Sequence, residues 1–295
     1  MRELTLATFN MHCGVDGWGR PYDVESACRL LDADILVLQE AWTPSKGPGM
    51  AQCIGEALGY DVITRPFARG WLLRPSADAP VRPSWGPNVW ARRRTLRALK
   101  RRARRERHRL RPFMASESSS GAQAPPELDA DIGSHSSPTF QPGTWDLSVL
   151  TRVPVSSVEI LGLGKLPIDP VPREAVMLTL QDAIPRDRAA LTIVGTHMSH
   201  LTDGSPVHYR RLARMLPADD IIVVGDMNMP GLALRAMLPR LRQVARGRTW
   251  PAWRPVIQSD HILATPGLAA RAIGTVASTV RGSDHLPVRA RFDLA

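Results

Sequence analysis

Short apolar runs that each lead into a polar side chain are the feature of this sequence that most restricts its fold. Runs of this length, bounded by turn-forming residues, predict buried strands and are too short for typical helices. The polar residues that follow the runs are Asn10, Gln39, Glu40, Thr196, His197, Asp226 and Asn228. Because ligand crevices in α/β sheets form at the carboxyl ends of strands, we expect these side chains to converge at one rim.

The predicted elements indicate a layered α/β fold. Helices are predicted over Val24–Leu31 and Met50–Leu58. The other regular segments are short β-rich runs: Leu4–Phe9, Ile35–Leu38, Leu147–Leu150, Ala175–Leu180, Ala190–Val194, Ile221–Val224, His261–Ala264 and Leu286–Phe292. Since strands dominate, the pattern favours an α/β sandwich over a strictly alternating parallel sheet. We expect a single domain over residues 1–295.

A long basic segment interrupts this pattern. The chain has 38 Lys and Arg residues against 28 Asp and Glu residues, a surplus of +10. Residues 92–111 contain eleven Arg and one Lys against one Glu and so carry +11, which leaves the rest of the chain close to neutral. We predict an insertion over residues 66–143, with a basic amphipathic helix over 85–111 and a disordered linker over 115–143.

Three interpretations of the basic helix remain open. It could be a solvated cationic face with no partner. Its apolar stripe, preceded by Trp85 and Trp90, also has the composition of an anchor for an anionic membrane surface. Its cations could instead neutralise the phosphates of a nucleic acid.

Other classes of protein are disfavoured by the sequence. The longest apolar runs are far shorter than the roughly 20 residues of a membrane span, so no transmembrane segment is expected. The N-terminus lacks the apolar core of a secretory signal, which indicates a cytoplasmic protein, peripheral to a membrane if the basic helix binds one. Cys13, Cys28 and Cys53 are an odd number without paired spacing and predict neither disulfides nor zinc. A monomer is expected.

Two further elements complete the set of polar residues, Asp260-His261 and Ser283-Asp284-His285. Together with the strand-end residues they supply carboxylates, neutral amides and histidines, a set that suits a hard divalent cation such as Mg²⁺, with Mn²⁺ as the substitute. A zinc site from His197, His200 and Asp284-His285 is less favoured, because neither pair has the HExxH spacing.

The ordered series of these residues resembles the endonuclease/exonuclease/phosphatase superfamily, the deoxyribonuclease I-like fold. Its members in this sequence are Thr-Phe-Asn10, Leu-Gln39-Glu40, Gly-Thr196-His197, Gly225-Asp226-Met-Asn228, Ser259-Asp260-His-Ile-Leu and Gly-Ser283-Asp284-His285-Leu-Pro. The resemblance covers roughly residues 2–65 and 143–294. It implies a four-layer α/β/β/α sandwich of two packed mixed β-sheets and metal-dependent hydrolysis of phosphoester bonds.

The resemblance also implies a role for each matching residue. It makes Glu40 a metal ligand together with Asn10 and Asp284, and His285 the catalytic histidine paired with the carboxylate of Asp260. Asp226 would orient or deprotonate the attacking water, and Asn228 would donate to a phosphate oxygen. His197 would stabilise the transition state or protonate the leaving oxygen. Arg173, which precedes a predicted strand, is a candidate phosphate ligand through its guanidinium group.

Two residues depart from one branch of the superfamily. His12 and His197 stand where the abasic-site DNA-repair branch carries an aspartate and a tyrosine, so the sequence points away from DNA repair. A Thr-His strand end looks more like the branch of deoxyribonuclease I, sphingomyelinases and inositol-polyphosphate phosphatases. The substrate is therefore expected to be a nucleic acid or a lipid or inositol phosphate. The alternative is a catalytically inactive binding or scaffold protein of the same fold.

Overall fold

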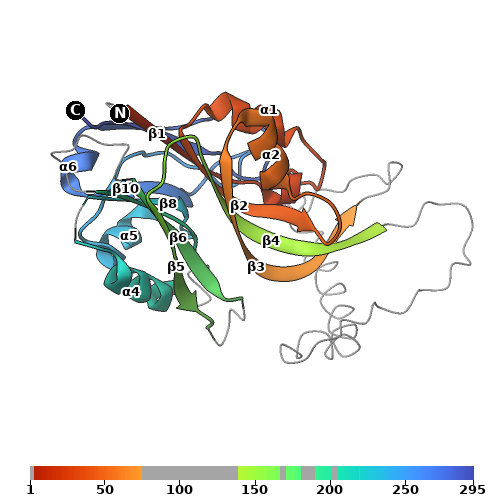
Figure 1. The fold of residues 1–295 in the computed structure, drawn as a ribbon, viewed down its shortest axis with the longest axis horizontal. Coiled ribbons are helices and arrows are strands. Elements are labelled where there is room, and N and C mark those ends of the chain that lie inside the picture. The colour runs from red at the N-terminus through yellow and green to blue at the C-terminus, as the bar shows by residue number, and fades with distance from the viewer. Residues whose placement is uncertain (1–2, 75–138, 167–170, 181–189, 201–204, 219) are drawn as a thin grey trace, which may run out of the picture.

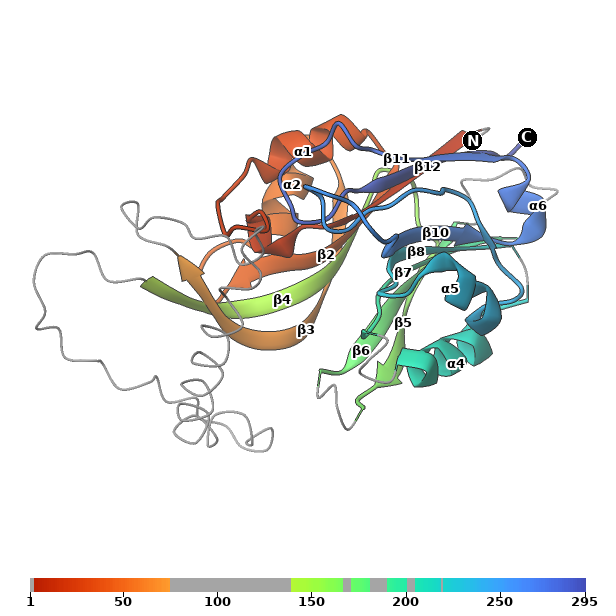
Figure 2. The same cartoon turned by 180° about the vertical axis from the view of Figure 1, so that it is seen from behind.

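The computed structural model describes residues 3–74, 139–166, 171–180, 190–200, 205–218 and 220–295, and its core is a pair of packed mixed sheets. The first sheet has the strand order β11-β12-β1-β2-β4-β3, and the second has the order β5-β6-β7-β8-β10-β9. Each contains one parallel pair, β1 with β2 and β7 with β8, among antiparallel neighbours. Figures 1 and 2 show the sheets face to face, with helices on the outside.

The strands have the following bounds. In the first sheet they are β1 Glu3–Asn10, β2 Ile35–Pro44, β3 Asp61–Arg74, β4 Thr139–Thr151, β11 Ala272–Val276 and β12 Val288–Asp293. In the second sheet they are β5 Ser157–Gly164, β6 Arg173–Leu180, β7 Leu191–His197, β8 Ile221–Asp226, β9 Arg242–Gln243 and β10 Asp260–Ala264. The four-layer sandwich expected from the sequence is therefore confirmed.

Alternating side chains of the strands build three apolar layers. Leu6 and Val37 of the first sheet pack with Ile193 and Val224 of the second in the central layer. Ala7 and Leu36 point the other way, beneath helices α1 (Val24–Leu31) and α2 (Met50–Leu58). Helices α4 (Ser205–Met215) and α5 (Gly231–Met237) cover the outer face of the second sheet, and the short segments η1 (His12–Gly14) and α6 (Pro266–Ala269) complete the described elements.

The two N-terminal helices follow local sequence signals closely. Asp23 caps α1, and its carboxylate accepts a hydrogen bond from the Ser26 backbone N–H at 3.0 Å. Gly59 ends α2 in the left-handed conformation, with φ of 71°. Both helices therefore have the bounds predicted from sequence.

Strands β3 and β4 extend into the segment expected as an insertion. They pair continuously from Asp61 with Thr151 to Arg74 with Thr139, so residues 66–74 and 139–143 belong to the sheet. Proline lacks the N–H that a strand donates to its neighbour, so the prolines of this segment argue against a strand in the sequence. The structure accommodates Pro66 where the register shifts between Pro66 and Ala68. The expected helix 85–111 and the linker up to residue 138 lie outside the described residues.

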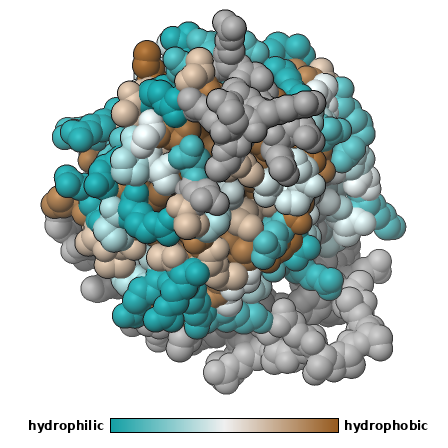
Figure 3. All heavy atoms as spheres, turned by 60° about the vertical axis from the view of Figure 1, so that its left-hand side comes forward, coloured by the Kyte–Doolittle hydropathy of each residue, from teal (hydrophilic) through white to brown (hydrophobic). Residues whose placement is uncertain are grey.

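The surface of the described residues has no dominant apolar region. On the face in Figure 3, hydrophilic and hydrophobic residues are interspersed. The most exposed large apolar side chains, Leu232, Ile273 and Leu30, come from three different elements. Within the part of the chain that the structure describes, no helix combines the length and the hydropathy needed to cross a membrane.

Candidate active site

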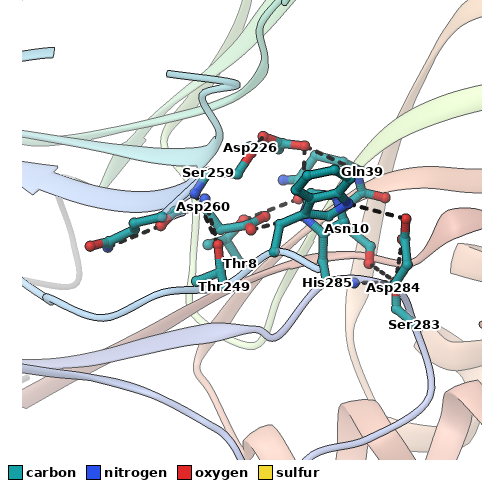
Figure 4. Close-up of polar contacts among 12 residues, drawn as sticks. Thr8, Asn10, Gln39, Asp226, Thr249, Ser259, Asp260, Ser283, Asp284 and His285 are labelled. Carbon is teal, nitrogen blue, oxygen red and sulfur yellow. Dashed lines mark hydrogen bonds and ion pairs between the residues drawn. The ribbon is translucent and has the colours of Figure 1, made fainter. Parts of the chain in front are cut away.

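The strand topology gathers the predicted site residues at one edge of the sandwich. Asn10 ends β1 and pairs with Gln39 of the parallel strand β2, while His197 ends β7 and pairs with Asp226 at the end of the parallel strand β8. Because β10 runs antiparallel to β8, its first residue, Asp260, lies opposite Asp226. Figure 4 shows Asn10, Gln39, Asp226 and Asp260 converging with Ser283, Asp284 and His285 from the loop before β12.

Local backbone geometry turns two of these residues into the site. Gln39 and Glu40 together face Leu147 of β4 in a β-bulge, and Glu40 has φ of 54°. Asn228 also adopts a left-handed conformation, with φ of 49°. A Cβ atom at Gly225, before Asp226, would lie 1.9 Å from the Thr196 carbonyl oxygen. A glycine is thus required for the close approach of β7 and β8 beside the site.

Asn10 joins the two sheets at the centre of the site. Its Nδ2 group donates to Glu40 Oε1 at 3.2 Å and to Asp226 Oδ2 at 3.1 Å. Its Oδ1 atom accepts the backbone N–H of His12 at 3.1 Å. The Ser283 hydroxyl donates to the Asn10 carbonyl oxygen at 2.7 Å and so ties the His285 loop to the same strand. Asn10 is therefore fixed by residues from both sheets.

His285 and Asp260 form a buried pair. His285 Nδ1 lies 2.8 Å from Asp260 Oδ2, and the exposed fraction is 9% for the His285 side chain and 0% for that of Asp260. Burial alone would lower the pKa of His285, but the charges of Asp260 and Asp226 outweigh it and raise the pKa to about 10. Burial raises the pKa of Asp260 to about 6. At neutral pH the pair is an imidazolium and a carboxylate.

Asp226 remains ionised because its neighbours stabilise the carboxylate. The Ser259 hydroxyl donates to Asp226 Oδ1 at 2.6 Å, and the Asn228 backbone N–H donates to the same atom at 2.9 Å. Burial opposes ionisation, yet the charge of His285, together with the hydrogen bonds from Ser259 and Asn10, lowers the pKa of Asp226. The serine immediately before Asp260 was the available sequence signal for this contact, and sequence reasoning gave it no role.

His197 stands beside these carboxylates as a neutral ring. Its Nε2 atom lies 3.7 Å from Asp226 Oδ2 and 3.9 Å from Glu40 Oε1. Burial, followed by the charge of Arg173, lowers the pKa of His197 to about 3. A neutral imidazole can donate an N–H hydrogen bond but is a poor proton donor, so this environment favours the first of the two roles expected for His197.

Phe67, which sequence reasoning missed, packs against His197. The two rings meet edge to face with centroids 5.5 Å apart, and the Arg173 guanidinium carbon lies 5.6 Å from the Phe67 ring centroid. These three residues line one small pocket with Arg65, Leu147 and Glu174. Arg173 also reaches the His197 carbonyl oxygen at 3.5 Å. The structure therefore places Arg173 at the rim of the site, beside His197.

Asp284 lies on the other side of the site. Its carboxylate accepts a hydrogen bond from Trp250 Nε1 at 3.4 Å and lies 3.6 Å from His12 Nδ1. The Ser283 hydroxyl accepts a hydrogen bond from the His285 backbone N–H at 3.2 Å and donates one to Asp284 Oδ1 at 3.4 Å. Tryptophan has no place in the sequence motifs, so only the fold reveals the Trp250 contact.

The donor set fits a divalent cation. The carboxylates of Glu40, Asp226, Asp260 and Asp284 surround the imidazolium of His285. Burial raises the pKa of Glu40 although the charges of His12 and His285 oppose the rise, and the charge of Asp284 adds to it, so a cation beside these two oxygen donors would relieve an unfavourable charge. Asp226, Asp260 and His285 also lie close enough to share an ion, but Asp260 is already paired with His285, and Asp226 already accepts a hydrogen bond from Ser259.

Three other histidines lie outside this constellation. His208 is buried between Ser199 and the Gly164 carbonyl oxygen. His261 is buried and contacts the carbonyl oxygens of Met229 and Gln258 at 3.0 and 3.1 Å. His200 is exposed beyond the end of β7. Cys13 and Cys28 are buried thiols and Cys53 an exposed one, all free, as expected.

Comparisons with known proteins agree with this geometry. The fold is similar to that of an endonuclease/exonuclease/phosphatase family protein from Leptotrichia buccalis, with a TM-score of 0.57 and 12% identity over 97% of this chain and 98% of that chain. The human Nocturnin catalytic domain gives a TM-score of 0.54 and 13% identity over 100% of this chain and 95% of that one. A mannosyl-6-phosphatase from Bacteroides thetaiotaomicron gives a TM-score of 0.51 and 14% identity over 98% of this chain and 99% of that chain.

At these identities the solved structures establish the fold alone. No curated protein sequence matches the chain. The model of the Endonuclease/Exonuclease/phosphatase family, in contrast, matches residues 7–285, nearly the whole chain and every site residue named above. The chain belongs to the endonuclease/exonuclease/phosphatase family.

Proposed function

We propose that the protein hydrolyses phosphoester bonds with the help of Mg²⁺, for which Mn²⁺ can substitute. The observation that carries this proposal is the assembly, in one cluster, of a charged His285–Asp260 pair and an excess of carboxylates that are buried or half-buried. Such a cluster repels an anionic substrate unless a cation is added, and with a cation it can bind a phosphate group.

Glu40 and Asp284 would hold the cation through carboxylate oxygens, and Asn10 would contribute its amide oxygen. When bound there, Mg²⁺ would polarise a phosphate oxygen and offset its negative charge. Glu40 Oε1 already accepts a hydrogen bond from Asn10, which fixes the orientation of the carboxylate before any cation arrives.

Asp226 would orient the attacking water and accept its proton. Its carboxylate is held by Asn10, Ser259 and the Asn228 backbone, so it cannot rotate away from the site. The Asn228 amide donates one N–H to the Met198 carbonyl oxygen at 2.9 Å. An amide NH₂ carries a second N–H, which would donate to a phosphate oxygen.

Two histidines and one arginine would stabilise the charge that develops on the phosphate. His285 would present its Nε2–H as an imidazolium, because Asp260 holds its Nδ1–H. His197 would donate its Nε2–H as a neutral ring, and Arg173 would bind a phosphate oxygen from the rim. Preorganised donors of this kind contribute most when they are buried, as these two histidines are.

The rival interpretation is a protein that keeps the fold but only binds. Such a protein is expected to have replaced at least one of Glu40, Asp226 and His285 by a residue that cannot bind a cation or transfer a proton. All three are present: Glu40 and Asp226 accept hydrogen bonds from the same Asn10 amide, and His285 lies 3.9 Å from Asp226. Hydrolysis is therefore the better-supported function, and we place the protein in the cytoplasm as a monomer.

A panel of phosphoesters tests the proposed function. The purified chain should release 4-nitrophenol from bis(4-nitrophenyl) phosphate, from 4-nitrophenyl phosphate, or from both when Mg²⁺ or Mn²⁺ is present. The ratio of the two rates separates a phosphodiesterase from a phosphomonoesterase. Turnover of neither substrate, and of no oligonucleotide or inositol phosphate, would favour the binding protein.

A further inference from the structure

A loop rich in arginine and tryptophan borders the active site. Residues 246–258, here called the Arg–Trp loop, contain Arg246, Arg248 and Arg254 together with Trp250 and Trp253, and no acidic residue. All three arginines are exposed, whereas both tryptophans are half-buried. Most of the chain's positive surplus lies in residues 92–111, so this loop is a separate concentration of positive charge.

The Arg–Trp loop is fastened to the catalytic segment. The Ala252 backbone N–H donates to the Asp284 carbonyl oxygen at 2.7 Å, and the Leu286 N–H donates to the Thr249 carbonyl oxygen at 2.8 Å. The ring centroid of Trp250, a residue of the loop, lies 6.5 Å from the ring centroid of His285. The loop is therefore an immediate neighbour of the residues expected to act on phosphate.

A second loop extends the aromatic surface. Trp18, from the segment after η1, packs against Trp253 with ring centroids 4.7 Å apart. A Cβ atom at Gly17 would lie 2.2 Å from the Trp253 ring, so the tryptophan rests directly on the Gly17 backbone. We call Trp18, Trp250 and Trp253 together the tryptophan wall, of which Trp250 is the member beside Asp284 and His285.

The charges around the tryptophan wall favour a polyanion. Arg281 is exposed and donates to the Ala252 carbonyl oxygen at 3.3 Å, which adds a fourth cation beside the three of the Arg–Trp loop. Arg20 lies over the Trp18 ring at 5.1 Å, and its charge is balanced by Asp16, at 2.6 Å. Aromatic rings beside a row of cations are the combination that binds single-stranded nucleic acid, since bases stack on the rings and arginines track the phosphates.

We propose that the tryptophan wall and the arginines beside it bind single-stranded nucleic acid and place one of its phosphates in the active site. This inference rests on the proposed function and gives it a substrate class. An anionic membrane is the less favoured partner, because a membrane anchor needs apolar side chains that leave the protein surface. Within the Arg–Trp loop only Val256 and Ile257 are exposed large apolar residues, at 53% and 42%.

Binding without hydrolysis is the first test. The full chain in EDTA is titrated into a fluorescein-labelled oligothymidylate, and the affinity is measured by anisotropy at several salt concentrations. Trp253→Leu should weaken binding about tenfold through lost stacking, with a smaller loss for Trp253→Phe. The double variant Arg248→Gln/Arg254→Gln should weaken binding and lower the salt slope by about two. Arg235→Gln, an exposed arginine of α5, is the matched control and should bind like the wild type.

An equal affinity of wild type and loop variants overturns the inference, even if the chain binds the oligonucleotide through other cations. The inference is also overturned if the loop variants lose affinity for phosphatidylserine vesicles but bind the oligonucleotide as tightly as the wild type does. The arginine variant alters only exposed side chains, so it decides the matter if Trp253→Leu fails to fold.

The small diester separates this inference from the proposed function. With Mg²⁺, Trp253→Leu should lose about tenfold more in kcat/KM on the oligonucleotide than on bis(4-nitrophenyl) phosphate, which is too small to reach the wall. Loop-dependent binding without any hydrolysis would contradict the proposed function and leave the binding surface intact. Hydrolysis of the small diester without an effect of the loop variants would contradict the binding surface alone.

Discussion

His285 Nδ1 lies 2.8 Å from Asp260 Oδ2 in a buried ion pair, and this contact decides the protonation state of the histidine. Asp260 comes from β10 and His285 from the loop before β12, so the contact forms only when the two sheets have packed. A histidine whose Nδ1–H is held in this way presents Nε2–H to the substrate. The pair thus links the packing of the sandwich to its chemistry.

Asp260→Asn should uncouple this pair. Asp260 is the strongest of the negative charges that raise the pKa of His285 to about 10, so its removal should bring the pKa down toward the ordinary value. We expect kcat to fall about 100-fold, within the usual range for groups that transfer or hold a proton. Activity is lost as pH rises through the pKa of the imidazolium, so the alkaline limb of the kcat/KM profile should move to lower pH. If the alkaline limb of the kcat/KM profile stays at the same pH in Asp260→Asn, that limb reports the titration of a group other than His285.

Glu40→Gln should weaken cation binding. The carboxylate is half-buried with a raised pKa, and replacing it by an amide removes the negative charge that would hold Mg²⁺. We expect the Mg²⁺ concentration for half-maximal activity to rise at least about tenfold, and the increase in Tm on adding Mg²⁺ to shrink. Without Mg²⁺ the variant should be more stable than the wild type, because a half-buried charge is lost.

Glu56→Gln provides the control for this comparison, because Glu56 is exposed on α2. A wild-type Mg²⁺ response in Glu40→Gln would place the cation elsewhere, with Asp226, Asp260 and His285 as the remaining described cluster.

Phe67→Leu should disturb His197 without touching the substrate. The substitution removes the edge-to-face contact at 5.5 Å and the ring beneath the Arg173 guanidinium. Aromatic pairs are worth about 0.5–1.5 kcal/mol, so we expect kcat to fall about threefold to tenfold with little change in KM. Phe67→Tyr keeps the ring and should keep the rate. Equal losses in both variants would show that the ring contact is not what positions His197.

His261→Gln should alter the pH dependence of stability. Burial lowers the pKa of His261 to about 4, from about 6.5 in an unfolded chain. Between these values the unfolded chain binds a proton that the folded protein does not, so the free energy of unfolding falls as pH drops below about 6.5. The contribution reaches about 2 kcal/mol at pH 5.

Glutamine keeps an N–H donor for the Met229 and Gln258 carbonyl oxygens but does not titrate. Urea unfolding at pH 7 and pH 5 should therefore show a smaller loss of stability in His261→Gln than in the wild type. If the free energy of unfolding falls equally in the two proteins between pH 7 and pH 5, His261 does not contribute to the pH dependence of stability.

The sequence predicts the elements with strong local signals and misses those held by tertiary contacts. Helix α1 has a capping aspartate and α2 a terminal glycine, and both have the predicted bounds. Strand β5 is an edge strand whose first residues are mostly exposed, so it lacks a clear apolar pattern. Strand β2 continues to Pro44 because the bulge at Gln39 and Glu40 lets polar residues interrupt a strand that pairing with β4 maintains.

The candidate site shows the same division. Strand ends that are distant in sequence share one edge, which brings together Asn10, Glu40, His197, Asp226, Asp260 and His285, whereas His261 of the same motifs packs outside this cluster. Phe67 and Trp250 belong to no motif and reach the site only through the twist of β3 and the Arg–Trp loop. Supporting residues of this kind depend on packing between elements, which a single sequence does not display.

The most direct test is the hydrolysis of bis(4-nitrophenyl) phosphate by wild type and His285→Ala across a Mg²⁺ titration. The proposed function predicts turnover that saturates with Mg²⁺, disappears in EDTA, and falls at least about 100-fold in the variant. Circular dichroism should show that the variant is folded. Turnover by the wild type in EDTA, or equal turnover by His285→Ala, would contradict a cation-dependent phosphoesterase centred on His285.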